Sequence, residues 1–124
     1  MLIVRMGDSI DRLPSLMRAI QQEGHKPIWM SDPMHANTVM ASDGRKTRYI
    51  EAITRELTEF QDAAASEGIH AGGVHLETTI DAVRECLGTS SDLRDRLASY
   101  TSLCDPRLTL SQAIEVLNHW KIRN

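Results

Sequence analysis

The chain has 124 residues, of which 41% are hydrophobic and 25% charged, with a formal net charge of −3. These values are ordinary for one soluble globular domain spanning residues 1–124, and they exclude a disordered or fibrous protein. The acidic balance and the aromatic content of only 4% argue against a nucleic-acid partner, which needs a basic surface and stacking rings.

The first strand–helix unit begins at the N-terminus. Residues 2–6 are a short β-branched run closed by Gly7, which predicts a buried strand that ends in a turn. Apolar side chains then recur at helical spacing through residues 10–20, and Gly24 marks the end of the helix.

The second unit repeats this order. A strand is expected near residues 26–30, followed by a polar loop over residues 31–46 with His35 at its mouth. A long helix follows and ends at Gly68. Its apolar stripe is made of residues in steps of three and four, namely Ile50, Ile53, Leu57, Phe60 and Ala64.

The third unit begins with a strand over residues 72–77, whose two glycines mark a tight entry. We expect a helix from Thr78 or Thr79 to about Leu87, and a shorter one over residues 92–99. The last expected helix covers residues 110–121. Its N-terminus has Thr109 and Gln112 in capping-box positions.

This alternation predicts an α/β fold of three βα units, with parallel strands, right-handed crossovers and helices on one side of the sheet. Long polar loops follow the C-terminal ends of the strands, whereas the connections that return to the next strand are short. This asymmetry indicates a functional face at the strand C-termini. Side-chain alternation places Arg5, His75 and Glu77 on the face opposite the helices. His35, Glu77 and Asp105 occupy comparable positions along the chain.

Each of these residues also has a simpler interpretation. His35 alone is a solvated loop histidine, Glu77 is a carboxylate paired with a neighbouring cation, and Asp105 is an N-terminal cap before Pro106. Arg5 forms a structural ion pair with Glu77 or Asp32. On the same view, His75 is a hydrogen-bonded structural histidine, and Lys46 and Arg48 belong to a solvated surface.

Five segments resemble the C-terminal part of class II 3-deoxy-arabino-heptulosonate 7-phosphate (DAHP) synthases. In chain order they are LIVRMGD (2–8), DPMHANT (32–38), GRKTR (44–48), GGVHLET (72–78) and CDPRL (104–108). The resemblance covers nearly the whole chain. It implies the last three βα units of a (β/α)₈ barrel, from the sixth strand onward.

The resemblance also implies a divalent metal site whose ligands include His35, Glu77 and Asp105. The family's fourth ligand, a cysteine, and most of its phosphate-binding residues belong to a preceding portion that has no counterpart here. A mixed nitrogen and oxygen ligand set suits Mn²⁺, Fe²⁺, Co²⁺ or Zn²⁺.

Further site residues follow from the same resemblance. Arg5 corresponds to an arginine that contacts phosphoenolpyruvate, and Lys46 and Arg48 match a basic motif at the active-site mouth, where we expect them to bind substrate. His75 is assigned from its position and not from the resemblance: it lies beside Glu77 on the same face, where we expect it to support a metal ligand or to act as a general acid/base.

The expected function is therefore a metal-dependent, DAHP-synthase-like enzyme, repurposed from the family's own reaction, that performs carbonyl or enol (aldol-type) chemistry on a small carboxylate or phosphorylated substrate. The family's reaction joins phosphoenolpyruvate to erythrose 4-phosphate at the entry to the shikimate pathway. Two alternatives stay open: one half of a split synthase, and a non-catalytic binding or regulatory module. Since three strands cannot close a barrel, we expect self-association or a complementing barrel half.

The expected location is the cytoplasm. No apolar run approaches the roughly 20 residues of a membrane span, and the N-terminus lacks a signal-peptide pattern. Cys86 and Cys104 are expected to be reduced thiols, and their spacing is not that of a CxxC pair.

Overall fold

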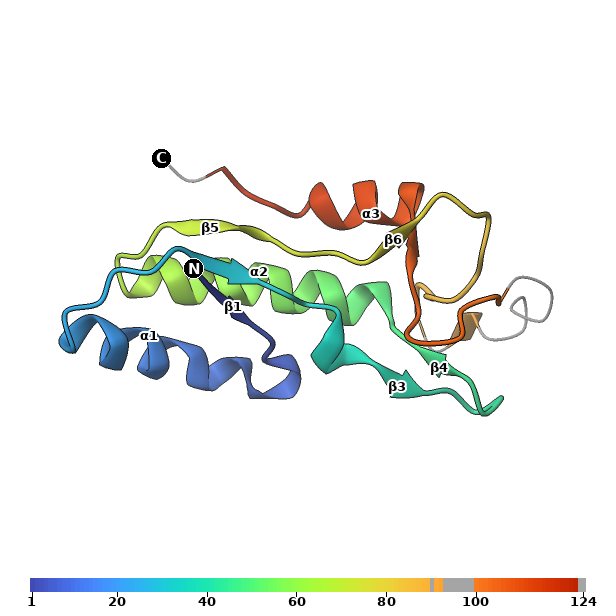
Figure 1. Cartoon of the computed structure of the whole chain (residues 1–124), viewed down its shortest axis with the longest axis horizontal. Helices are drawn as coiled ribbons and strands as arrows, with labels where there is room; N and C mark the ends of the chain where they lie inside the picture. The colour runs from blue at the N-terminus through green and yellow to red at the C-terminus, as the bar shows by residue number, and fades with distance from the viewer. Residues whose placement is uncertain (90, 93–99, 123–124) are drawn as a thin grey trace.

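The computed structural model describes residues 1–89, 91–92 and 100–122, and it is an open α/β arrangement (Figure 1). Its strands are β1 (Leu2–Val4), β2 (Trp29–Ser31), β3 (Val39–Met40), β4 (Lys46–Thr47), β5 (Ala71–Val74), β6 (Thr78–Thr79) and β7 (Leu108–Thr109). Its helices are α1 (Leu13–Gln22), α2 (Ile50–Ser66) and α3 (Leu110–Leu117), with short 3-10 helices at Gly7–Arg12 and His35–Asn37.

The central sheet is parallel, as predicted, with the strand order β1-β2-β5. Beyond β5 the same segment forms β6, which pairs in parallel with β7. The backbone N–H of Leu108 donates to the carbonyl of Glu77 (3.0 Å), next to the pairing of Thr78 with Leu108. Four chain segments therefore run in parallel, one more than predicted. They form two separate sheets, β1-β2-β5 and β6-β7, and barrel closure is not seen among the described residues.

The core lies between the sheet and the helices. One cluster joins Val4 and Trp29 of the sheet to α1 and to the C-terminal half of α2, and a second joins Val74 and Leu76 to the N-terminal half of α2 and to α3. Ile3, whose side chain alternates with that of Val4, is 44% exposed. These observations agree with the predicted alternation of the strands and with a sheet covered by helices on one face.

Helix α2 confirms the apolar stripe that the sequence predicts. Its stripe residues Ile50, Ile53, Leu57, Phe60 and Ala64 are all buried. Gly68 follows the helix with φ of +65°, and Gly24 follows α1 with φ of +80°. Glycine adopts this left-handed conformation at little cost, so both glycines end their helices as expected.

The prediction of a helix between Thr78 and Leu87 is wrong. Thr78 and Thr79 form β6, and the chain then continues without helix to an isolated parallel bridge between Leu87 and Tyr49. Both backbone hydrogen-bonding groups of Leu87 are engaged in this pairing. Its N–H donates to the carbonyl of Arg48 (3.0 Å), and its carbonyl accepts from the N–H of Ile50 (2.8 Å). Pairing with a distant segment therefore overrides a weak local helical pattern.

Other boundaries differ less. The strands are shorter than predicted, and α3 ends at Leu117 instead of residue 121. The polar loop after β2 contains an antiparallel hairpin of β3 and β4 that was not expected. The helix predicted over residues 92–99 falls mainly on residues 93–99, outside the described ranges. None of the described helices has the length and apolar character needed to span a membrane.

Candidate functional site

Polar side chains gather where the parallel strands end. Arg5 directly follows β1, Asp32 directly follows β2, and Glu77 follows β5. Because the carboxyl ends of parallel strands meet at one edge of a sheet, these residues lie close together. The loop after β2 brings His35 to the same edge, and the neighbouring strand β4 adds Lys46 and leads into Arg48.

Asp32 orients His35. The Asp32 carboxylate is fully buried and accepts hydrogen bonds from the backbone N–H groups of Met34 (3.1 Å) and His35 (3.2 Å), and from His35 Nδ1 (2.7 Å). Arg5 Nε lies 2.9 Å from the same carboxylate. Burial acts to raise the pKa of Asp32, but the hydrogen bonds from His35 and Met34 outweigh burial and hold the pKa below its usual value.

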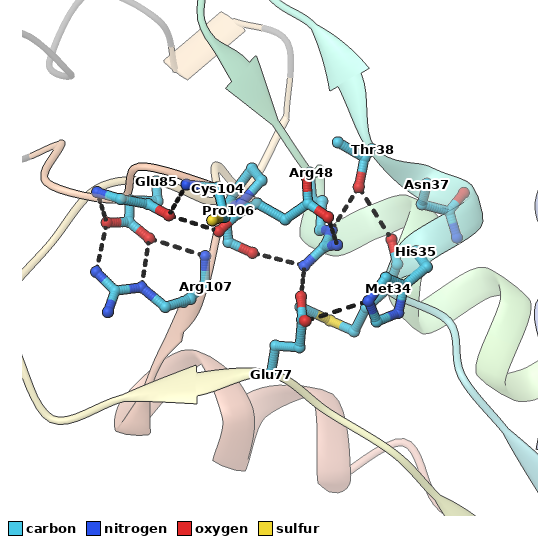
Figure 2. A network of polar contacts seen from close by, with 12 residues as sticks. Met34, His35, Asn37, Thr38, Arg48, Glu77, Glu85, Cys104, Pro106 and Arg107 are labelled. Atoms are coloured by element: carbon cyan, nitrogen blue, oxygen red, sulfur yellow. Dashed lines mark hydrogen bonds and ion pairs between the residues drawn. The ribbon is translucent and has the colours of Figure 1, made fainter.

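His35 presents its other ring nitrogen to Glu77. His35 Nε2 lies 3.1 Å from Glu77 Oε1, as Figure 2 shows. The second oxygen of Glu77 accepts a hydrogen bond from Nη1 of Arg48, which also donates to the carbonyl of Pro106 (2.6 Å). Asp32, His35, Glu77 and Arg48 therefore form one continuous line of polar contacts.

Arg48 is fully buried, although the sequence allowed it to be part of a solvated surface. Its Nε donates to Thr38 Oγ1 (2.8 Å), and its Nη2 lies 3.7 Å from Asp105 Oδ2 without a hydrogen bond to any described residue. A buried guanidinium nitrogen without a partner is costly. This nitrogen is the feature of the site most suited to bind a further oxygen atom.

Asp105 joins the site from the segment before β7. Its carboxylate accepts a hydrogen bond from Lys46 Nζ (3.0 Å), and this bond holds the pKa of Asp105 below its usual value. Asp105 and Glu77 both line a pocket of about 620 Å³. The structure therefore brings all three predicted metal ligands to the same edge, with Arg48 between the two carboxylates.

The three predicted ligands do not form a complete metal site. In the part of the chain that the structure describes, no group of three His, Cys, Asp or Glu side chains is arranged to hold a metal ion. His35 and Glu77 face each other directly, whereas Asp105 is held by Lys46 and Arg48. Their roles as ligands stay a prediction.

Arg5 and His75 lie beside this line of contacts. Arg5 pairs with Asp32, which is one of the two partners that its structural interpretation allowed, and 57% of its side chain is exposed. His75 is exposed and stacks on His35 with a distance of 6.2 Å between the ring centroids. Both residues border the site, and their catalytic roles stay predictions.

Sequence reasoning missed a buried carboxylate that fastens two site segments. Glu56 of α2 accepts hydrogen bonds from the backbone of Met6 (2.8 Å) and Gly7 (2.9 Å) and from Asn37 Nδ2 (2.6 Å). Burial raises its pKa. A signal was present: Glu56 lies beside Leu57 on the apolar side of α2, where a charged residue needs polar partners.

A second buried carboxylate, Glu85, was also missed. It accepts hydrogen bonds from Arg107 and from the backbone of Thr101 and Ser102, as the left side of Figure 2 shows in part. Burial acts to raise its pKa, but the contacts with Arg107 outweigh burial and lower it. No periodic pattern marks Glu85, because its segment has no regular secondary structure.

Comparison with known proteins gives a consistent result. The sequence model of the class-II DAHP synthetase family matches residues 1–119. A probable phospho-2-dehydro-3-deoxyheptonate aldolase of Pseudomonas fluorescens is 51% identical over 122 residues, which are 97% of this chain and 30% of that protein.

Two further relatives are named phospho-2-dehydro-3-deoxyheptonate aldolase. The protein of Mycolicibacterium smegmatis is 40% identical over 93% of this chain and 26% of its own length. The protein of Streptomyces coelicolor is 41% identical over 92% of this chain and 26% of its own length. The chain thus spans less than a third of the length of each of these relatives. With the family match extending over residues 1–119, the chain belongs to the class-II DAHP synthetase family.

Proposed function

We propose that this chain supplies the metal- and anion-binding edge of a DAHP-synthase-type active site, for the aldol-type condensation of phosphoenolpyruvate with erythrose 4-phosphate. The observation that carries the proposal is the line of contacts from Asp32 through His35 and Glu77 to Arg48 at the strand ends. The names of the three relatives, all phospho-2-dehydro-3-deoxyheptonate aldolases, support the choice of reaction.

Two of the proposed metal ligands fit a divalent ion well. Nitrogen and oxygen donors bound to one ion at about 2.0–2.2 Å lie roughly 3 Å from each other, and His35 Nε2 lies 3.1 Å from Glu77 Oε1. Metal-binding histidines usually give their other N–H to a carboxylate, and Asp32 takes that position on Nδ1 (2.7 Å). Asp105 is the proposed third ligand.

The proposed ligand set of one imidazole and two carboxylates suits Mn²⁺, Fe²⁺, Co²⁺ or Zn²⁺. Such an ion, when bound, polarises a carbonyl oxygen and so activates an aldehyde towards attack by an enol carbon. In this proposal His75 moves a proton at the edge of the site, and its exposure and its stacking on His35 support that role.

Three cationic side chains at the C-terminal edge of the strands bind the anionic substrate in this proposal, namely Arg5, Lys46 and Arg48. The guanidinium of Arg5 is accessible beside Asp32, and Nη2 of Arg48 has a free hydrogen-bond donor among the described residues. Guanidinium groups match the planar geometry of carboxylates and phosphates. Lys46, half-exposed on β4, adds a further positive charge at the pocket that Asp105 lines.

We also propose that the site is completed by another polypeptide segment, either a second copy of this chain or a complementing barrel half. Strands β1 and β5 each have a hydrogen-bonded neighbour on one side only within the described sheet. Unpaired strand edges bind further strands readily. In the family, the strands of the preceding portion of the barrel would bring the cysteine ligand and additional phosphate-binding residues.

Metal binding is the direct test. Isothermal titration of the purified chain with Mn²⁺ and Co²⁺ is expected to show one site, which His35→Ala abolishes. His70→Ala is the matched control, because His70 is an exposed histidine that makes none of the contacts of the site. A chain that binds neither ion, or a His35→Ala variant that binds as the wild type does, would contradict the proposed ligand set.

Activity is the second test. Consumption of phosphoenolpyruvate in the presence of erythrose 4-phosphate is measured for the chain alone and for the chain mixed with a polypeptide that covers the remaining portion of a relative. Activity on mixing that Arg5→Lys lowers supports the proposed role in the condensation. Inactivity of every mixture, with metal binding intact, would contradict the reaction but not the metal site.

A further inference from the structure

Glu85 is a fully buried carboxylate whose two oxygens accept six hydrogen bonds. Oε1 accepts from the backbone and hydroxyl of Thr101, from the backbone of Ser102 (2.9 Å) and from Nη2 of Arg107 (2.8 Å). Oε2 accepts from the backbone N–H (2.9 Å) and Nε (3.0 Å) of Arg107. One carboxylate therefore fastens both ends of the segment 101–107.

This segment carries Asp105. Within it, Ser102 Oγ donates to the carbonyl of Asp105 (2.8 Å), so the bonds made by Glu85 reach Asp105 through a single residue. Thr101, Ser102 and Arg107 line the same pocket as Asp105 and Glu77, whereas the Glu85 side chain is buried behind them. Glu85 thus shapes this wall of the pocket from outside.

The backbone around Glu85 is bonded to the strand that carries the cations of the site. The carbonyl of Glu85 accepts a hydrogen bond from Thr47 Oγ1 (2.9 Å), and the N–H of Leu87 donates to the carbonyl of Arg48 (3.0 Å). Residues 85–87 therefore connect the segment of Asp105 to Thr47 of β4 and to Arg48, which follows it.

We infer that Glu85 is a positioning residue that holds Asp105 at its place opposite Glu77 through the segment 101–107. This inference rests on the proposed function, because it assumes that Asp105 acts as a ligand at this edge. Without the Glu85 carboxylate, the partly buried N–H groups of Ser102 and Arg107 lose their acceptor, and a partly buried donor without a partner favours a different loop position. Bonds that hold a ligand in place typically change metal affinity by about 10–100-fold.

The test compares Glu85→Gln with Glu67→Gln. Glu67 forms a similar two-pronged pair with Arg18, between α1 and α2, and makes no contact with the site. Amide hydrogen exchange of residues 100–108, followed by mass spectrometry without metal, is expected to become about tenfold faster in Glu85→Gln and to stay unchanged in Glu67→Gln. Unchanged exchange in Glu85→Gln would overturn the inference.

Cobalt binding gives the second measurement. Glu85→Gln is expected to bind Co²⁺ about tenfold or more weakly and to change the visible absorption spectrum of the bound ion, which reports its ligands. A mere loss of stability leaves that spectrum unchanged, and an unchanged spectrum with unchanged affinity overturns the positioning role. If the wild type binds no Co²⁺, the proposed metal site fails, while the exchange measurement still tests whether Glu85 holds the segment.

A second variant covers the case in which Glu85→Gln does not fold. Arg107→Lys keeps the positive charge but loses the two-pronged contact with Glu85, since a lysine amine is a single point charge. The expected result is the same faster exchange of residues 100–108, with a smaller change than in Glu85→Gln. Arg107→Lys with the exchange of the wild type would contradict the inference.

Discussion

Asp32 is the residue on which the geometry of the site depends most directly. It is fully buried, and it binds the backbone of its own loop, the ring of His35 and the guanidinium of Arg5 at once. In a histidine ring, the hydrogen bond made by one nitrogen decides whether the other nitrogen carries a proton and where it points. The bond from Nδ1 to Asp32 therefore sets the state of Nε2, which faces Glu77. A motif of Asp, Pro, any residue and His after a strand thus both anchors the loop and orients the histidine ring.

Replacement of Asp32 by asparagine is expected to lower the free energy of unfolding by about 2–4 kcal/mol, because the amide cannot accept all of these hydrogen bonds and leaves buried donors without partners. Urea denaturation followed by circular dichroism measures the change. Asp8→Asn is the control: Asp8 is almost fully exposed beside Arg55, and its loss leaves the unfolding free energy unchanged. Equal stability of the two variants would show that Asp32 does not anchor the loop.

The two buried glutamates are expected to give opposite pH dependences. The pKa of Glu85 is lowered from 4.5, so its contribution to stability is complete above that value and is lost as the pH falls through the folded-state pKa. The pKa of Glu56 is raised from 4.5, so its contribution is present at low pH and is lost as the pH rises through the folded-state pKa.

Urea unfolding between pH 3 and pH 7 tests this pair of signs. The difference in unfolding free energy between the wild type and Glu85→Gln is expected to shrink as the pH falls. Over the same fall in pH, the wild type is expected to become more stable relative to Glu56→Gln. Two differences that move in the same direction with pH would contradict the assigned environments.

Among the secondary-structure elements, the helices with a regular sequence pattern were predicted correctly, whereas the irregular segment after Thr79 was not. The apolar stripe of α2 and the capping box at Thr109 are present in the structure. Both signals are local, because a helix forms its hydrogen bonds within itself. The segment after Thr79 was predicted wrongly because its backbone bonds are made with Arg48 and Ile50, more than 30 residues earlier in the chain.

The candidate site was predictable to a similar extent. His35, Glu77 and Asp105 were placed by strand ends and by resemblance, and all three lie at one edge. The burial of Arg48 and the role of Glu85 were not predictable, because each depends on contacts between residues far apart in sequence. For Glu56, the sequence signals the need for polar partners but not which residues supply them.

The capping box of α3 gives a prediction at this scale. Thr109 Oγ1 accepts from the N–H of Gln112, and the Gln112 side chain accepts from the N–H of Thr109. Thr109→Ala is expected to lower the unfolding free energy by about 1 kcal/mol. The matched control, Thr58→Ala within α2, is expected to be neutral or slightly stabilising, since alanine is the better helix former there. A similar loss in both variants would exclude a specific cap at Thr109.

For the molecule as a whole, the open sheet is accompanied by an uncovered apolar face on α3. Leu110, Ile114 and Leu117 are 66%, 50% and 45% exposed, and their spacing of four and three places them on one side of the helix. The other side of α3 packs on the core through Ala113 and Val116. A helix with apolar residues on both sides normally lies between two layers. This arrangement favours the proposed completion by a further polypeptide segment.

The solution mass tests that proposal. Sedimentation of the purified chain is expected to give a mass above the 13.9 kDa of one copy, which falls towards that value on dilution. Ile114→Lys is expected to shift the mass towards one copy, because a charge on the apolar face of α3 opposes association. Glu115→Lys, which changes an exposed neighbour of Ile114 on the same helix, leaves the mass as in the wild type. A single copy at every concentration, with an ordinary melting temperature, would contradict self-association and leave the complementing barrel half as the proposed partner.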